Sequence, residues 1–136
     1  MNDLSPDDTT DNADSLGIYI YDDTHPRASI VHVFGEATFA ERAAFEAAID
    51  GAAAGKRPVV INLRECSYID CAAVGVIVRT AKNLRDDLRL ALQSGTQGYR
   101  ILELTGLTRV LQIFETVEEA AGPIAEPLPP PQLRVV

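Results

Sequence analysis

The chain has 136 residues, of which 46% are hydrophobic, and a net charge of −8. This size predicts one domain with a real core, and the acidic balance argues against nucleic-acid binding, which needs clustered Lys and Arg. No apolar run approaches the roughly 18–20 residues of a membrane span. The start at Met1-Asn2-Asp3-Leu4 is unlike a signal peptide and there are only two cysteines, so the expected location is the cytoplasm.

Both ends of the sequence are expected to lie outside the folded domain. Five aspartates and no basic residue fall within the first 14 residues, a pattern typical of disorder, so residues 1–15 are predicted to be an acidic N-terminal tail. The run Pro127-Leu128-Pro129-Pro130-Pro131 can form neither strand nor helix and predicts a Pro-rich C-terminal tail over residues 125–136. A single domain remains at residues 16–124.

The first half of the domain predicts two strands and a helix. Leu16–Tyr21 and Ser29–Phe34 are rich in Ile, Val, Tyr and Phe, as strands are, and Gly35 is expected to end the second one. Phe39–Ala54 follows the helical period, with its apolar residues on one face.

The second half of the domain alternates between strands and helices. Its predicted strands are Val59–Leu63, Leu88–Leu92 and Val110–Phe114, and its predicted helices are Ala72–Arg85, Thr96–Leu104, ending near Gly106, and Thr116–Ala121. The first of these strands is almost wholly apolar, which is typical of a central strand covered on both faces. The whole order predicts an α/β fold with a single mixed sheet of about five strands and about four helices.

The segment Asp70-Cys71-Ala72-Ala73-Val74-Gly75 follows the central strand and opens the second helix. Backbone N–H groups converge at such a junction, so it is a common place for reactive or switchable side chains. Cys66 is expected in the loop that precedes it. A disulfide between Cys66 and Cys71 is not expected, because five extended residues span about 16–18 Å and a disulfide needs Cα atoms within roughly 7 Å.

Four segments together resemble the STAS domain, and within it the bacterial anti-sigma factor antagonists. Gly35-Glu36 is similar to the start of that family's Gly-Glu-Leu-Asp turn, and Asp70–Gly75 lies on its Asp-Ser-Ser-Gly-Leu-Gly switch. Val60-Ile61-Asn62-Leu63 followed by Ser67-Tyr68-Ile69-Asp70 matches the family's approach to the switch, and Leu104-Thr105-Gly106-Leu107 lies on its Ser-Gly-Leu segment. The resemblance covers about residues 16–121.

This resemblance implies a non-enzymatic binding protein without cofactor or metal. Its implied partner is an anti-sigma factor, typically a serine kinase of the histidine-kinase-like ATPase fold, which phosphorylates the Ser after the Asp and thereby ends binding. A phosphoryl group adds about −1.5 to −2 charge, which would spoil a partner's surface. Formation of a homodimer stays open. The implied partner-binding residues are Glu36, Thr38, Asp70, Cys71, Ala72, Ala73 and Val74.

The chain departs from the family pattern at the phosphoacceptor, where Cys71 stands in place of Ser. Three interpretations compete. Cys71 is a permanently unphosphorylated substitute for Ser, or its thiol is itself a redox switch, with Cys66 as a second candidate thiol, or it only packs. Ser67 is kept as an alternative phosphorylation site.

Several other residues have structural explanations that compete with functional ones. Asp70 and Thr38 are expected to be helix N-caps, the latter with Glu41 three residues on. His25 and His32 have no second ligand at metal spacing.

The alternative functions are a module that binds a nucleotide or lipid, a scaffold in a stress-signalling complex and, with least support, a thiol enzyme. Thiol enzymes need glycines and a nearby arginine around the nucleophile, whereas Arg79 is two turns into the predicted helix.

Overall fold

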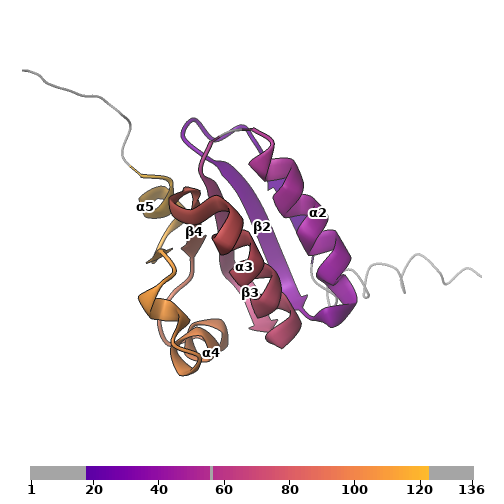
Figure 1. Ribbon diagram of the computed structural model, residues 1–136, viewed down its shortest axis with the longest axis vertical. Coiled ribbons are helices and arrows are strands. Elements are labelled where there is room, and N and C mark those ends of the chain that lie inside the picture. The colour runs from indigo at the N-terminus through magenta and orange to yellow at the C-terminus, as the bar shows by residue number, and fades with distance from the viewer. Residues whose placement is uncertain (1–17, 56, 123–136) are drawn as a thin grey trace, which may run out of the picture.

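The computed structural model describes residues 18–55 and 57–122 (Figure 1). The tails predicted at 1–15 and 125–136 lie outside these residues, as does the start of the strand predicted at Leu16–Tyr21. The described residues contain one five-stranded sheet in the order β1-β2-β3-β4-β5. The sheet is mixed, because β1 pairs with β2 antiparallel while the other neighbours pair parallel. The predicted single mixed sheet with four helices is confirmed.

The order of elements is the predicted one. The strands are β1 (Ile18–Asp22), β2 (Ser29–Ala37), β3 (Val59–Ile69), β4 (Leu88–Ala91) and β5 (Ile113–Phe114). The helices are α2 (Arg42–Ala53), α3 (Cys71–Leu84), α4 (Gln97–Leu104) and α5 (Val117–Ala121), with 3₁₀ turns η1 (Phe39–Glu41), η2 (Arg85–Asp87) and η3 (Leu107–Arg109). None of the helices in the described ranges has the length and apolar character needed to cross a membrane.

The two faces of the sheet carry separate cores, because successive strand residues point to opposite faces. One face, with Val31 and Ile61, packs against α2, α3 and α4 and forms the larger cluster. The other, with Ile30 and Val60, packs against α5 in a smaller cluster. Figure 1 shows α2 and α3 side by side across the first face.

The central strand β3 is longer than the sequence indicates. It was expected to end at Leu63, but it continues to Ile69 and includes Cys66, which was expected in a loop. The extension pairs parallel with the end of β2, up to Ala37 opposite Ile69. Two irregularities in the register accommodate extra residues of β3, so the apolar alternation that marks a strand is broken there. A long-range partner strand, not the local sequence, therefore fixes this segment.

The strand β2 also passes through Gly35, where the sequence predicts its end. Gly35 adopts φ 76° next to one of the register irregularities, a backbone conformation that glycine reaches without a Cβ clash. The extra residue at this irregularity is on β3, and the positive φ of Gly35 lets β2 continue beside it, two residues further, to Ala37.

The predicted strand Val110–Phe114 is mostly wrong. Backbone bonds from the N–H groups of Val110 and Leu111 to the carbonyl of Leu107 turn the chain in η3, and only Ile113–Phe114 pair with β4. Gly106, at φ 78°, starts this turn directly after α4, which confirms the predicted end of that helix.

Candidate functional site

The candidate site lies where the parallel strands β2 and β3 end together and α3 begins. Ala37 and Ile69 are paired at this edge of the sheet, and the N–H of Asp70 donates to the carbonyl of Ala37 at 3.1 Å. The next residue, Cys71, is the first residue of α3. The predicted Asp70–Gly75 segment therefore lies at the edge of the sheet where β3 ends.

Asp70 joins the starts of two helical segments. Its Oδ1 accepts from the N–H of Ala73 at 3.0 Å, and its Oδ2 accepts from the N–H of Phe39 in η1 at 2.9 Å. The first bond confirms the predicted N-cap of α3, and the second was not foreseen. Since both oxygens are engaged inside the protein, Asp70 fixes the position of α3 relative to η1.

A second set of hydrogen bonds, between Glu41 and Thr38, holds the start of η1. The Glu41 side chain turns back, and its Oε1 accepts from the N–H of Thr38 at 3.0 Å and from the Thr38 hydroxyl at 2.7 Å. Glu41 is nearly buried, with 8% of its surface exposed. The predicted cap at Thr38 is thus confirmed, and its hydroxyl faces inward to Glu41.

The two cysteines have different environments, and both are free thiols. Cys71 is exposed at the start of α3. Cys66 is half-buried in β3, where its Sγ donates to the carbonyl of Tyr68 at 3.2 Å, and burial raises the pKa of its thiol. Cys71 is therefore the more accessible of the two thiols to a partner or a reagent.

The remaining residues of the predicted partner surface differ in what they expose. Glu36 is exposed near the end of β2, and Ala72 is half-buried on α3. The side chains of Ala73 and Val74 belong to the core, with 1% and 8% of their surfaces exposed. They contribute mainly the shape of the first turn of α3.

Two aromatic residues at this site escaped the sequence analysis. Phe39 is 66% exposed, with the guanidinium of Arg42 5.2 Å from its ring centroid, and Tyr68 is 43% exposed on β3. Tyr68 lies opposite Glu36 in the register. The sequence signal was weak, because Phe39 reads as the first apolar residue of a helix. Only the bond between its N–H and Asp70 places it beside α3.

A buried phenol lies beneath this surface. The ring of Tyr19 on β1 stacks on Phe45 of α2, with 4.9 Å between centroids. Its hydroxyl is buried and has no hydrogen-bond partner among the described residues. Burial raises its pKa, and the charges of Glu41, Cys66 and Asp70 act in the same direction. The acidic groups of the site therefore add to the effect of burial in raising the pKa of the Tyr19 phenol.

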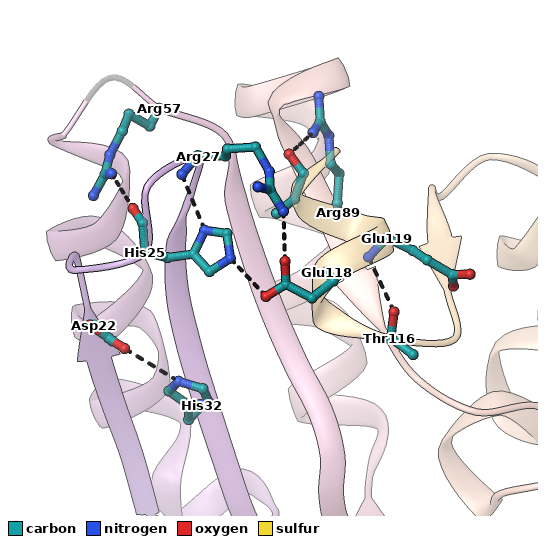
Figure 2. Close-up of polar contacts among 10 residues, drawn as sticks. Asp22, His25, Arg27, His32, Arg57, Arg89, Thr116, Glu118 and Glu119 are labelled. Carbon is teal, nitrogen blue, oxygen red and sulfur yellow. Dashed lines mark hydrogen bonds and ion pairs between the residues drawn. The ribbon is translucent and has the colours of Figure 1, made fainter. Parts of the chain in front are cut away.

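Groups with catalytic potential lie elsewhere (Figure 2). His25 contacts Glu118 of α5 at 3.1 Å and precedes β2, so it lies at the opposite end of the parallel strands from Cys71. His32 lies within β2 and contacts Asn62 at 3.0 Å. Arg79 donates to Glu46 at 2.6 Å. No three His, Cys, Asp or Glu residues in the described ranges are grouped to hold a metal ion.

Comparison with known proteins shows which family has this fold. The family model described as the STAS domain matches residues 19–120. An anti-sigma factor antagonist from Mycobacterium paratuberculosis has a similar structure, with 24% identity, a TM-score of 0.69 and coverage of 79% of this chain and 92% of that one. At these identities, structural similarity shows the fold alone.

Two further solved structures agree. The Bacillus cell fate determinant SpoIIAA in its phosphorylated form is 20% identical, with a TM-score of 0.55 and coverage of 76% of this chain and 96% of that one. A putative anti-sigma factor antagonist from Thermotoga maritima is 23% identical, with a TM-score of 0.56 and coverage of 76% and 90%. Since the family match runs from β1 to α5, the chain belongs to the STAS domain family.

Proposed function

We propose that this protein is a non-enzymatic regulatory binding protein, an anti-sigma factor antagonist, which binds its partner through the surface at the start of α3. The observation that carries the proposal is a pair of hydrogen bonds, which the Asp70 carboxylate accepts from the N–H groups of Ala73 and Phe39. These bonds hold Phe39, whose ring is exposed, and the helical turn that exposes Cys71 in one fixed arrangement. A fixed surface costs less conformational entropy on binding.

The chemistry of this surface fits protein recognition. Phe39, Tyr68 and Arg42 are residue types that often dominate binding energy at protein interfaces. Phe39 is bonded through its N–H to Asp70, and Cys71 follows Asp70 at the exposed start of α3, where its neighbour Ala72 offers little bulk. The proposed partner is an anti-sigma factor, by likeness to the anti-sigma factor antagonist of the same fold. Serine-kinase activity of this partner is what the resemblance of Asp70–Gly75 to the family's switch implies.

The Cys71 position makes this antagonist insensitive to the phosphorylation switch. A thiol is not the ordinary acceptor of a serine kinase, so the wild-type surface stays competent to bind. Incubation with a purified anti-sigma kinase from the protein's own organism and ATP should label Cys71→Ser and leave the wild type unlabelled. Phosphopeptide mass spectrometry locates the label. A wild-type label at Ser67 would instead support the alternative phosphorylation site.

The binding surface is tested by adding charge. Cys71→Asp should weaken binding to the anti-sigma factor by about tenfold or more, because it places a carboxylate within the interface. Ala47→Asp is the matched control, since Ala47 is exposed on α2, away from α3's first turn. Equal binding by wild type and Cys71→Asp in isothermal titration calorimetry would show that the interface lies elsewhere.

Redox control of the same site rests on the exposure of Cys71, since a thiol must be accessible to be oxidised. Peroxide treatment should weaken the binding of wild type and leave Cys71→Ala unchanged. Equal binding of reduced and treated wild type would leave Cys71 as a silent replacement for Ser.

A further inference from the structure

A second apolar surface lies on the C-terminal half of α3, away from the proposed partner site. Val78, Ala81 and Lys82 of α3 face Leu107, Val110 and Leu111, which form η3 and the chain after it. Together these six residues, here named the η3 groove, line a hollow of about 250 Å³. Val78 and Lys82 follow Cys71 by seven and eleven residues, so the groove lies about 10–16 Å along the helix from Cys71.

The groove exposes apolar side chains that could have been buried. Val110 is 73% exposed, although burial of a valine side chain normally stabilises a protein. The turn at η3 holds it there, because the N–H groups of Val110 and Leu111 both bond to the carbonyl of Leu107, at 3.1 Å and 2.9 Å. An apolar wall fixed in this way can receive apolar side chains without rearranging.

The one charged residue that lines the groove is a cation, in a protein whose net charge is −8. Lys82 lines it directly, and an adjoining hollow of about 130 Å³ shares Ala81 and Val110 and adds Arg85 and Asp86. Arg85 has φ 54° and ψ −120°, a backbone conformation that is strained for a non-glycine residue. The chain thus carries a cation where glycine would be easier to place.

We propose that the η3 groove binds an acidic amphipathic helix of a partner protein, which inserts two apolar side chains spaced one turn apart. The groove is smaller than the roughly 300–1,000 Å³ of small-molecule sites, so it suits side chains better than a cofactor. Its walls come from helical segments, and apolar residues at i and i+3 or i+4 are how a helix fills such a groove. Acidic residues beside them would pair with Lys82 and Arg85.

This site is independent of the proposed antagonist surface, and a display experiment tests it alone. Random peptides of about 15 residues, four turns of helix, are selected on the full-length protein and counter-selected on Val110→Asp. The proposal expects enriched sequences with an i, i+3 or i, i+4 apolar pair and neighbouring Asp or Glu. Enrichment of basic or uncharged sequences, or no sequence that separates the two proteins, would overturn it.

Matched variants then localise the binding of the best synthetic peptide by fluorescence anisotropy. Val110→Asp and Lys82→Glu should each weaken it by about tenfold or more. Leu104→Asp should leave it unchanged, because Leu104 is equally exposed at 73% but does not line the groove. Equal losses in Leu104→Asp and Val110→Asp would refute a specific groove.

The chain's own acidic N-terminal segment is the competing occupant. Deletion of residues 2–15 should leave peptide affinity unchanged if the groove serves a partner. A gain of about tenfold on deletion would show that this segment occupies the groove, and would overturn the assignment to a partner helix.

Discussion

The two ends of the parallel strands use their polar groups in opposite ways. Where β2 and β3 end, Asp70 and Glu41 bond to backbone N–H groups inside the protein and leave Phe39, Tyr68 and Cys71 facing outward. Where these strands begin, Glu118 of α5 pairs with Arg27 and His25 from the segment before β2. A rigid backbone under an apolar exterior suits binding, whereas paired charges suit closure of the fold.

The opposite end of the sheet, where β2 and β3 begin, is here called the closed end, and it joins the β1–β2 turn to α5 (Figure 2). Glu118 of α5 accepts from Arg27 at 2.6 Å and lies 3.1 Å from Nε2 of His25. Nδ1 of His25 accepts from the N–H of Arg27 at 3.1 Å, and Arg57 donates to the carbonyl of His25 at 2.5 Å. Nδ1 carries no proton in this arrangement, so the proton of a neutral His25 is on Nε2 and points to Glu118.

The end of the sheet where β2 and β3 terminate is here called the open end. The largest effect is expected from removing the hydrogen bonds of Asp70 there. Asp70→Ala removes the N-cap of α3 and the bond to the N–H of Phe39, and should lower the free energy of unfolding by about 2–3 kcal/mol. Urea denaturation measures the loss. Asp70→Asn retains one acceptor oxygen and should fall between wild type and Asp70→Ala. A loss in Asp70→Ala below about 0.5 kcal/mol, the low end for a cap, would show that the carboxylate does not join the two segments.

Local sequence predicted the parts of the open end that local interactions determine. The spacing of Thr38 and Glu41 predicted the cap of η1, and the place of Asp70 before an apolar helical run predicted the cap of α3. Each cap bond lies within three residues of its partner, so it can be read from a short window. The bond from Phe39 to Asp70 spans 31 residues and could not.

The same limit explains the errors in β3 and β5. Polar residues Arg64 and Glu65 interrupt the apolar pattern of β3, yet pairing with β2 keeps this segment extended to Ile69. Near β5 the opposite occurs, since the apolar residues Val110 and Leu111 look like a strand but are turned by η3. In β3, long-range pairing with β2 overrides local propensity, which is why the exposure of Tyr68 was not foreseen, whereas near β5 the local backbone bonds of η3 do so.

The next largest effect concerns the two thiols at the open end. Cys71 is exposed, whereas burial raises the pKa of the Cys66 thiol, so less of the reactive thiolate is present there. Alkylation by iodoacetamide at neutral pH should be about tenfold or more faster at Cys71. Peptide mass spectrometry over time distinguishes the sites, and Cys71→Ala should remove the fast phase alone. Equal rates would mean that β3 opens readily around Cys66.

A smaller effect is expected at the closed end, because Glu118 is 72% exposed and water screens its ion pairs. Its hydrogen bonds with His25 and then Arg27 lower its pKa below the ordinary 4.5. The stability it contributes is therefore present above pH 4.5 and lost as the pH falls through the lowered value. Glu118→Gln should speed amide exchange in α5 by about threefold at neutral pH.

The effect of Glu118 on α5 is expected to depend on pH. Below pH 4.5 the difference in α5 exchange between wild type and Glu118→Gln should shrink, because the wild-type carboxyl becomes neutral as well. Glu119→Gln is the matched control, since Glu119 is also exposed on α5. Unequal exchange that persists through the acid range would assign the effect to something other than this charge.

The smallest effect is expected from Tyr19, the phenol beneath the open end. Its buried hydroxyl has no partner among the described residues, so Tyr19→Phe removes an uncompensated polar group and should stabilise the protein by about 1 kcal/mol. Burial raises its pKa above the ordinary 10.0, so the folded state keeps the proton that the unfolded chain releases. Wild type should therefore lose stability as the pH rises above 10.0, and Tyr19→Phe should lose less.

Tyr21→Phe controls for loss of a tyrosine hydroxyl on the same strand, since Tyr21 is 37% exposed. Urea denaturation of the three proteins at neutral and alkaline pH separates the two contributions. A destabilised Tyr19→Phe at neutral pH would mean that the hydroxyl bonds to an internal water, because a satisfied group is costly to remove.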